Sequence, residues 1–222
     1  MLELVKTADG SNTLFNRKVG EHYHSCHGAL QESRHVFLKA GLEYWLSHSS
    51  SSQVSVLEVG FGTGLNFLLT TDHCMDKNVE LNYTGIEPYP LDLQLLKNIE
   101  YDRHSLQDVC KNFYSSYIVS LEKKILISDN CELEIIVSKL LDFQSEQLFD
   151  IVYFDAFASA RQPEMWTVES ISHACKYMRP GGVFVTYAIT GNLKRTMKLL
   201  GFTVHKIQGA PGKREMLRAI KN

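Results

Sequence analysis

The chain lacks the features that would place it in a membrane or outside the cell. No stretch of its 222 residues approaches the roughly 18 apolar residues that a membrane span needs. Residues 1–9 contain no basic segment followed by an apolar one, so we expect no secretory signal. Five cysteines are scattered without a Cys-x-x-Cys pair, which fits reduced thiols better than a disulfide framework. We therefore expect a cytoplasmic protein with no membrane partner.

The composition is that of an ordinary globular protein. Hydrophobic residues make up 44% of the chain and charged residues 22%. This length accommodates one sizeable α/β domain with a small appendage. No internal repeat is present, and the serine-rich stretch 47–52 is typical of a linker. We predict an N-terminal extension over residues 1–52 and a main domain over 53–222.

The net charge of −2 does not favour a polyanionic partner, but the charges are unevenly distributed. Residues 191–222 contain eight Lys and Arg against one acid, whereas residues 1–190 contain fifteen against twenty-four. A basic C-terminal segment on an otherwise acidic protein could bind a polyanion. The same residues could equally form solvated helix and strand faces, and composition alone favours that simpler interpretation.

The extension is predicted to hold three elements. Residues 2–7 and 13–17 alternate in polarity around the turn sequence Asp-Gly-Ser-Asn, which predicts a β-hairpin. Residues 20–28 are polar and aromatic, and we interpret them as a lid segment. Apolar residues recur at helical spacing over residues 29–46, which predicts a helix.

The main domain alternates strands and helices, the pattern of a doubly wound, mostly parallel sheet. The short turn around residues 209–212 requires the last two strands to be antiparallel. That ending is typical of methyltransferases of this fold, so we predict a seven-stranded, Rossmann-like sheet. The predicted strands are 54–59, 81–86, 133–137, 149–154, 183–188, 202–207 and 215–220.

The turn after the first strand of this domain is the most informative motif. Its sequence is Glu58-x-Gly60-x-Gly62-x-Gly64, followed by a helical pattern. Glycine adopts positive φ and allows a ligand close to the backbone. The spacing differs from the Gly-x-Gly-x-x-Gly of dinucleotide binders. It matches the pattern with which methyltransferases hold S-adenosylmethionine, whose ammonium the glutamate would help to bind. A tight turn without a ligand is the alternative.

Acidic residues end or follow three further strands of the sheet, and ligands bind at these strand ends in such folds. Glu87 could accept hydrogen bonds from both ribose hydroxyls of the cofactor, and Asp142 from its adenine amino group. Asp155 lies where a methyl acceptor would sit. Acids also end strands because they suit turns and helix N-caps, so each has a purely structural alternative.

The cluster His22, His24, Cys26 and His27 consists of side chains that can bind metals. Its spacing matches no zinc motif, so we predict no metal. A lid over the cofactor, part of the acceptor site and a local structural role remain open.

Several segments together resemble the methyltransferase domain of the bifunctional tRNA 5-methylaminomethyl-2-thiouridine biosynthesis protein, over nearly the whole chain. The glycine turn alone would indicate only a methyltransferase, whereas the other segments are more specific. The matching segments begin at Asp9 (DGSNTL), Gly20 (GEHYHS), Gly28 (GALQES), His35 (HVFL), Leu57 (LEVGFGTGLN), Phe154 (FDAFA), Pro163 (PEMW), Arg179 (RPGG) and Lys213 (KREML).

This resemblance implies S-adenosylmethionine as cofactor and methylation of an aminomethyl group on carbon 5 of the wobble uridine of tRNA. Asp155 would face the amine as the catalytic residue. We expect a stand-alone form without the flavin-dependent oxidase domain, so a separate oxidase or another aminomethyl-uridine-forming enzyme would supply the acceptor. The residues assigned to the cofactor are Glu58, Gly60, Gly62, Gly64, Asn66, Glu87 and Asp142.

Other residues are candidates for contacts with tRNA. Lys213 and Arg214 in the last hairpin are expected at phosphates. Tyr23, Phe157 and Trp166 could stack on an extruded base, or could be core residues. Two other functions remain open: a methyltransferase for small-molecule or protein amines, and an inactive adenosyl-binding scaffold.

Overall fold

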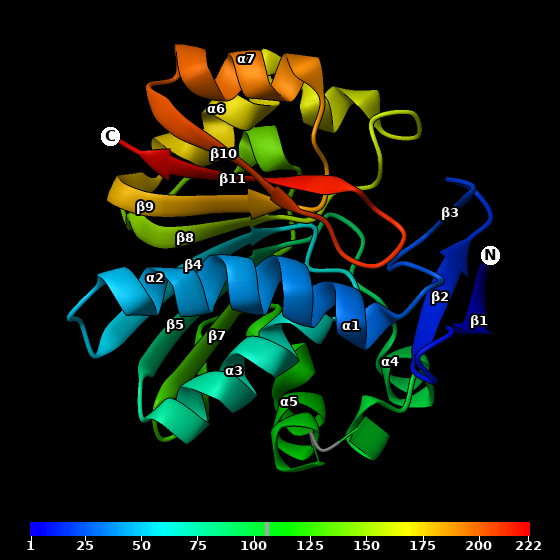
Figure 1. Cartoon of the computed structure of the whole chain (residues 1–222). Coiled ribbons are helices and arrows are strands. Elements are labelled where there is room, and N and C mark those ends of the chain that lie inside the picture. Colours follow the sequence, from blue (N-terminus) through cyan, green and yellow to red (C-terminus); the bar gives the residue numbers. More distant parts are fainter. Residues whose placement is uncertain (105–106) are drawn as a thin grey trace.

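An eight-stranded sheet runs through the centre of the computed structural model, which describes residues 1–104 and 107–222 (Figure 1). The order of its strands is β10-β11-β9-β8-β4-β5-β7-β6. The strands are β4 (Gln53–Val59), β5 (Glu80–Ile86), β6 (Ile125–Ser128), β7 (Cys131–Ile136), β8 (Phe149–Phe154), β9 (Met178–Thr186), β10 (Phe202–Gln208) and β11 (Glu215–Lys221).

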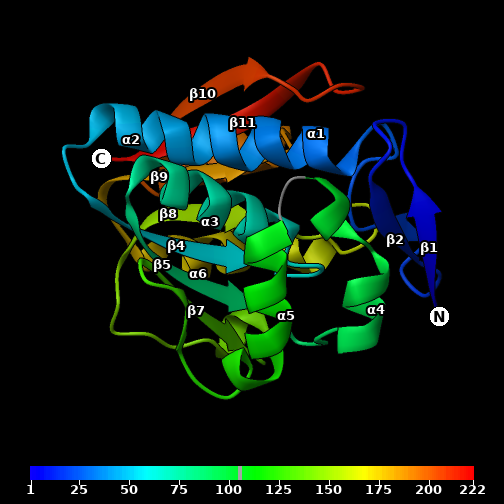
Figure 2. The same ribbon diagram turned by 90° about the horizontal axis from the view of Figure 1, so that it is seen from below.

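Helices cover both faces of this sheet (Figures 1 and 2). One face carries a long N-terminal helix formed by α1 (Ala29–Ser33), η1 (Arg34–Glu43) and α2 (Tyr44–His48), together with α3 (Leu65–Lys77) and α5 (Gln107–Ser120). The other carries α6 (Val168–Lys176) and α7 (Gly191–Leu199). Shorter helices are α4 (Leu93–Asn98), η2 (Tyr101–His104), η3 (Leu140–Asp142) and η4 (Pro163–Trp166). None of the helices in the described ranges is long and apolar enough to cross a bilayer.

The strand directions confirm the predicted doubly wound sheet with an antiparallel end. Strands β4, β5, β7, β8 and β9 pair in parallel, and β10 and β11 close one edge as an antiparallel hairpin. Strand β6 is an eighth strand that the sequence did not predict. It pairs antiparallel with β7 around the turn at Asp129 and Asn130, and its four residues are too few to show a periodic pattern.

Strand β4 lies at the point where the strand order reverses. Its neighbours are β5 on one side and β8 on the other, so the chain continues in opposite directions across the sheet from β4. Its valines and leucine suit a strand that is covered on both faces, and residues 54–59 are all buried. In sheets of this kind ligands bind beyond the carboxyl ends of the strands at this reversal.

The extension forms a small sheet and the long helix. Strands β1 (Leu2–Lys6) and β2 (Asn12–Asn16) make the predicted hairpin, and β3 (Glu21–His22) adds a third strand that was not predicted. The predicted helix is present, but its middle ten residues, η1, are π-helical. A π-helix is wider than an α-helix. Gly41 nevertheless brings η1 so close to the sheet that a Cβ there would lie 2.9 Å from the Tyr153 ring.

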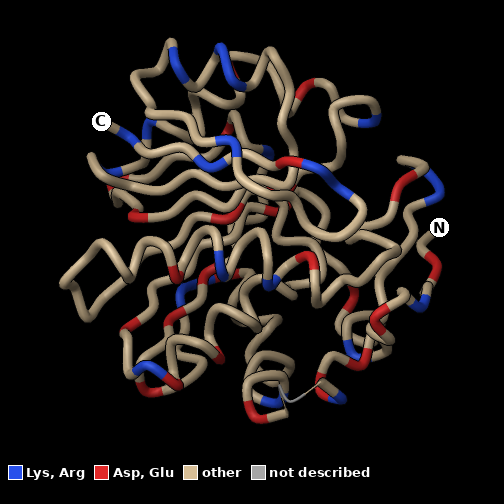
Figure 3. Tube along the Cα trace, in the orientation of Figure 1, with Lys and Arg blue, Asp and Glu red and all other residues tan. Residues whose placement is uncertain are grey.

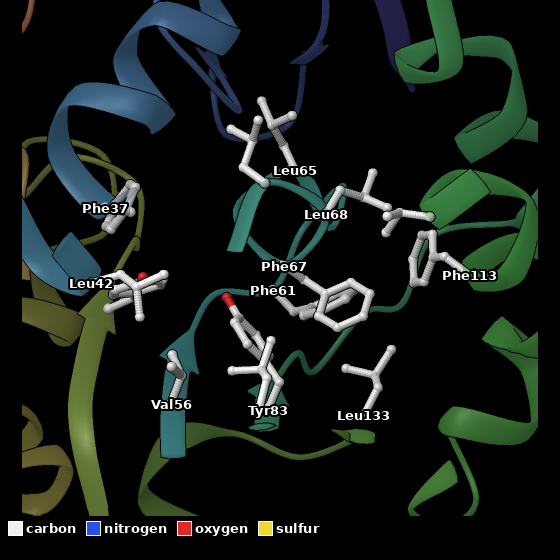
Figure 4. Close-up of a cluster of buried hydrophobic side chains, with 14 of the residues drawn as sticks. Phe37, Leu42, Val56, Phe61, Leu65, Phe67, Leu68, Tyr83, Phe113 and Leu133 are labelled. Carbon is white, nitrogen blue, oxygen red and sulfur yellow. The ribbon is translucent and has the colours of Figure 1, made fainter. Parts of the chain in front are cut away.

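The helix of the extension shares a hydrophobic core with the main domain. Phe37 and Leu42 are 2% and 0% exposed and belong to the same buried cluster as Val56 and Tyr83 of the sheet (Figure 4). Residue 52, the predicted boundary, falls between α2 and β4. The two parts are therefore packed through side chains on both sides of that position.

Local signals explain where the later helices begin and end. The predicted helix at Pro163 starts as the 3₁₀ turn η4, and α6 follows with the Thr167 hydroxyl accepting a hydrogen bond from Ser170 N at 3.1 Å. Thr190 caps α7 in the same way. Gly201, with φ +83°, ends α7 as predicted.

Candidate active site

A cavity of about 1220 Å³ lies over the carboxyl ends of β4, β5 and β8. Ligand sites in proteins commonly occupy about 300–1,000 Å³, so this cavity has room for a cofactor and an acceptor side by side. The described part of its lining contains seven acids and four strong bases. An excess of carboxylates favours cationic ligands. The acids are Glu21, Glu32, Glu87, Asp92, Asp142, Asp155 and Glu164, and the bases are Lys18, Lys139, Arg161 and Lys213.

The glycine turn forms the floor of this cavity. Gly60, Gly62 and Gly64 all have positive φ, at +87°, +53° and +77°, which confirms the predicted turn. A Cβ at Gly60 would lie 2.5 Å from the carbonyl oxygen of Asp155. The backbone of the turn therefore packs directly against the backbone at the end of β8. Glycine at this position is therefore required by both conformation and space.

An aromatic cluster supports the turn from below (Figure 4). The Phe61 ring lies 6.1 Å from the rings of Phe67 and Phe113 and 6.4 Å from that of Tyr83, between ring centroids. Gly85 of β5 makes room for it, because a Cβ there would lie 2.3 Å from the Phe61 ring. The backbone amides of Gly60 and Phe61 both donate to the Ile86 carbonyl at 3.0 and 3.1 Å. These contacts hold the turn in one conformation.

Glu87 lines the cavity at the end of β5. Its carboxylate accepts hydrogen bonds from the amides of Gly62 and Tyr89, each at 3.0 Å. Burial raises the pKa of Glu87, while these two hydrogen bonds favour its charged form. The structure thus fixes Glu87 against the glycine turn, and contact with the cofactor ribose stays a prediction.

Glu58 lies behind the cavity wall. Its side chain is 0% exposed, and its two oxygens accept hydrogen bonds from Asn66 Nδ2 at 2.7 Å and Tyr83 Oη at 2.8 Å. Burial first, and then the charge of Asp155, raises the pKa of Glu58 well above its usual range. Glu58 is therefore connected to Asp155 of the cavity wall through Asn66, and its contact with the cofactor ammonium stays a prediction.

Asn66 connects this buried network to the reactive end of the cavity. Its Nδ2 also donates to Asp155 Oδ2 at 2.8 Å. Its Oδ1 is buried and, within the described part of the chain, has no hydrogen-bond partner. A buried acceptor without a donor is unfavourable. Asn66 is not among the described residues that line the cavity, so its contact with the cofactor stays a prediction.

Asp155 follows β8 and is half-buried in the cavity wall. Burial and the neighbouring charge of Glu32 raise the pKa of Asp155 to about 7, against the opposing hydrogen bond from Asn66 and the charge of Lys213. A carboxyl group with a pKa near neutrality can accept and release a proton at working pH.

Aromatic side chains from distant segments line the wall next to Asp155. Tyr23 and Phe157 meet edge to face, with 5.3 Å between ring centroids. Trp166 is half-buried and packs against the core instead, with its ring centroid 5.2 Å from that of Phe154. Its Nε1 donates to the Phe157 carbonyl at 2.7 Å. Trp166 thus fixes the backbone of a cavity residue, while Tyr23 and Phe157 present their rings to the cavity.

The two cations predicted at phosphates occupy different environments. Lys213 Nζ contacts Glu32 Oε1 at 2.9 Å and lies 3.7 Å from the centroid of the Tyr187 ring, within the cavity wall. Arg214 is exposed on the neighbouring turn. Figure 3 shows the basic residues of the C-terminal part along α7 and this hairpin. Lys213 therefore belongs to the interior of the site.

Asp142 and the histidines lie at the edges of the site. Asp142 is exposed at the end of η3 on the cavity rim, so its contact with an adenine stays a prediction. His24 is buried, with its Nδ1 3.2 Å from Thr13 Oγ1, and burial lowers the pKa of His24 to about 4. His22 packs on Phe15 and lines the cavity. The described residues contain no group of three or more His, Cys, Asp or Glu placed to hold a metal.

The end of the cavity around Asp155, here called the acceptor end, includes three residues that were not predicted: Glu21, Glu32 and Tyr187. Glu21 and Glu32 lie within GEHYHS and GALQES, two segments that carried the family resemblance. Treating every polar residue of those segments as a candidate would have found them. Tyr187 had no such signal, because it simply continues an apolar strand.

The residues present fit S-adenosylmethionine. The positive-φ turn allows a ligand to approach the backbone, Glu87 offers a fixed carboxylate, and the acidic lining suits a ligand with a sulfonium and an ammonium. Together with the antiparallel hairpin β10–β11, these features define a methyltransferase of class I, with a Rossmann-like fold.

The comparisons with known proteins identify the family. Residues 104–222 match the model of a family described as S-adenosyl-L-methionine-dependent methyltransferase. The chain belongs to this family, and S-adenosylmethionine is its cofactor.

Curated relatives and solved structures agree with this membership. The chain is 30% identical over 209 residues to the tRNA 5-methylaminomethyl-2-thiouridine biosynthesis bifunctional protein MnmC of Idiomarina loihiensis, covering 88% of this chain and 34% of that protein. The MnmC of Methylobacillus flagellatus is 28% identical over 213 residues, covering 91% and 33%. The chain thus spans about a third of the length of these relatives. The crystal structure of MnmC2 from Aquifex aeolicus has the same fold, with a TM-score of 0.79 and 22% identity over 99% of this chain and 70% of that one.

Proposed function

We propose that the protein methylates the 5-aminomethyl group of the wobble uridine, or 2-thiouridine, in tRNA and so forms 5-methylaminomethyl-uridine. Two relatives that are similar over about nine tenths of this chain are named for the biosynthesis of that nucleoside. The observation that carries the proposal is Asp155, a carboxyl group with a pKa of about 7 in an acidic cavity beside two aromatic rings. Such a site suits an amine attached to a planar base.

The cofactor supplies a methyl group already activated by a sulfonium, so the protein mainly aligns the reactants. The amine must lose a proton before it can attack, because an alkylammonium has a pKa of about 10 in water. Its nitrogen then forms the new C–N bond as the C–S bond breaks and leaves its electron pair on sulfur. Asp155 accepts a proton from nitrogen, and Asn66 holds that carboxylate in place.

In this proposal the two ends of the cavity have different ligands. The glycine turn and Glu87 hold the ribose and amino-acid parts of the cofactor. Glu58 supports this end of the cavity through Asn66, and Asp142 borders the adenine. Tyr23 and Phe157 stack on the extruded uracil. A separate oxidase or another enzyme that forms aminomethyl-uridine supplies the acceptor, and the reaction takes place in the cytoplasm.

The tRNA backbone would contact exposed cations outside the cavity. Arg214 is one of them. A shallow hollow of about 630 Å³ adds Arg34, Lys39 and Arg103, and it lies against the same segment, residues 25–32, that forms part of the cavity wall. The single acid in its described lining, Asp9, already accepts hydrogen bonds from the amides of Ser11 and Gln31 at 3.0 Å. This leaves the hollow electropositive, which suits phosphates.

Labelled S-adenosylmethionine and bulk tRNA from cells that lack the gene test the proposal. We expect label to enter this tRNA and to appear after digestion as 5-methylaminomethyl-uridine or its 2-thio form. Transfer RNA from wild-type cells is the control and should accept little label, because its sites are already methylated. No incorporation into either tRNA would contradict the proposal.

A methyltransferase for small-molecule or protein amines is the second candidate. The acidic lining of the cavity supports it, since carboxylates suit any amine. Labelling of a protein or metabolite fraction, with none in tRNA, would favour it. An inactive scaffold is a third possibility, and calorimetric binding of S-adenosylmethionine without turnover on any of these fractions would point to it.

A further inference from the structure

Three carboxylates from separate segments meet at the acceptor end of the cavity. Glu21 comes from β3, Glu32 from α1 and Asp155 from the end of β8, and all three line the cavity. Both glutamates belong to the N-terminal extension. Their negative charges contribute to the raised pKa of Asp155, which places them within electrostatic range of it.

Backbone contacts fix both glutamates in place. Glu21 accepts a hydrogen bond from the Ala158 amide at 2.9 Å, three residues after Asp155. Glu32 accepts one from the Ser25 amide at 2.7 Å. A carboxylate held by a backbone amide remains where it is when a ligand approaches, so it can exclude an anion instead of turning away.

Lys213 is the cation whose charge acts on Asp155, and other groups already contact it. Lys213 Nζ contacts Glu32 Oε1 at 2.9 Å and packs over the Tyr187 ring at 3.7 Å from its centroid. The Tyr187 hydroxyl is itself held by the Ala156 carbonyl at 2.9 Å. Glu32 therefore neutralises the ammonium that would otherwise attract a negatively charged acceptor.

We propose that Glu21 and Glu32 are specificity residues that make the acceptor end admit an amine and exclude an amine carrying a carboxylate. This inference rests on the proposed function. It further specifies that the substituent on carbon 5 of the acceptor must not carry a negative charge. A carboxylate placed beside Asp155 would meet three acids and a lysine already paired with one of them. Like charges in a partly desolvated site give strong discrimination.

The test uses three anticodon stem-loops that differ at carbon 5 of the wobble uridine. One carries a primary aminomethyl group and serves as substrate. The other two carry the N-ethyl and the N-carboxymethyl derivatives of that group and serve as competing ligands. The carboxymethyl group is larger than the ethyl group, but that difference is the same in every protein tested. The change in the ratio of their inhibition constants between wild type and a Glu→Gln variant therefore isolates the effect of charge. Inhibition can be measured whether or not either derivative is methylated.

For the wild-type protein we expect the N-carboxymethyl derivative to inhibit about tenfold more weakly than the N-ethyl derivative, or worse. Glu21→Gln should reduce this ratio severalfold. Glu32→Gln should reduce it more, because it also releases the Lys213 ammonium. The double variant Glu32→Gln with Lys213→Met should not show this additional reduction of the ratio. Glu164→Gln, which removes a carboxylate from the exposed rim of the same cavity, should leave the ratio unchanged.

The outcomes separate this inference from the proposed function. A wild-type protein that leaves the primary aminomethyl stem-loop unmethylated contradicts the proposed function itself. If it methylates that stem-loop but excludes both derivatives equally, exclusion is steric and the inference is wrong. The inference also fails if Glu21→Gln and Glu32→Gln, shown to be folded by unchanged S-adenosylmethionine affinity, keep the wild-type ratio.

Discussion

The two ends of the cavity are built in different ways. The cofactor end comes from neighbouring strands, β4 and β5, and consists largely of backbone: a turn of three positive-φ glycines held by the Ile86 carbonyl and by Glu87. The acceptor end consists of side chains brought together from five separate segments. They are Glu21 and Glu32 of the extension, Asp155 after β8, Tyr187 after β9 and Lys213 in the last hairpin.

This difference separates what is general in the molecule from what is particular to it. A backbone turn at the reversal point of a doubly wound sheet can hold the same cofactor for many acceptors. The side chains of the acceptor end make their contacts only if extension, sheet and hairpin are all in place. Variants at the two ends should therefore fail in different measurements.

The largest effect is expected for Asp155→Ala. Turnover should fall by a factor on the order of 10³, because the carboxylate that accepts the proton is removed. Affinity for S-adenosylmethionine should change by no more than severalfold, because the glycine turn and Glu87 are untouched. Single-turnover methylation and calorimetric titration measure the two quantities. A fully active Asp155→Ala protein would rule out the assignment.

Gly62→Ala should have the opposite pattern. Its φ of +53° is unfavourable for alanine, and the new Cβ would lie 3.0 Å from the Tyr23 ring. Displacing the Gly62 amide from Glu87 should weaken cofactor binding about tenfold, which corresponds to ~1.4 kcal/mol.

Gly181→Ala is the matched control for this variant. Its φ of +76° is similarly unfavourable, but a Cβ there meets nothing within 4 Å. We expect a comparable loss of thermal stability and normal calorimetric affinity for S-adenosylmethionine. Equal loss of affinity in both variants would show that the effect comes from strain in general.

The raised pKa of Asp155 has a consequence for stability. The folded protein holds this proton up to about pH 7, whereas the unfolded chain releases it near its ordinary value of 3.8, so ionisation destabilises the fold as pH rises between these values. Asp155→Asn, which carries no charge, should gain up to ~4 kcal/mol over wild type at pH 8 and little at pH 4. Thermal melts across this range measure the gain. A gain that shrinks as pH rises would contradict the assigned pKa.

The smallest effect is expected on the outer surface. Arg34→Glu with Lys39→Glu should weaken tRNA binding several-fold at low salt and reduce its salt dependence, while S-adenosylmethionine affinity stays the same. Lys77→Glu with Lys123→Glu changes the net charge equally at exposed positions outside the hollow. Filter binding at several salt concentrations should distinguish the pairs. Identical losses would mean that only overall charge matters.

The cofactor end and the fold could be predicted because their signals are local. Apolar periodicity gave the strands, the spacing of Gly60, Gly62 and Gly64 gave the turn, and the short turn at 209–212 required the antiparallel hairpin. Such patterns depend on neighbouring residues and on backbone conformation, which a single sequence displays.

The acceptor end depends on contacts between distant residues, so the sequence showed its parts but not their arrangement. Lys213 was predicted at a phosphate because it lies in a basic segment, yet Glu32, 181 positions away, holds it inside the cavity. Trp166 was predicted either to stack on a base or to be a core residue, and it is half-buried against Phe154, outside the described lining of the cavity. Glu58 was assigned to the cofactor, but its position beneath Asn66 appears only after the sheet is folded.

One product analysis tests the central claim most directly. The protein is incubated with S-adenosylmethionine that carries a deuterated methyl group and with an anticodon stem-loop that contains 5-aminomethyl-uridine. We predict that mass spectrometry of the digested nucleosides finds the heavy methyl on the aminomethyl nitrogen, and none in a stem-loop with plain uridine at that position. A heavy methyl on any other atom, or equal labelling of the two stem-loops, would contradict the account.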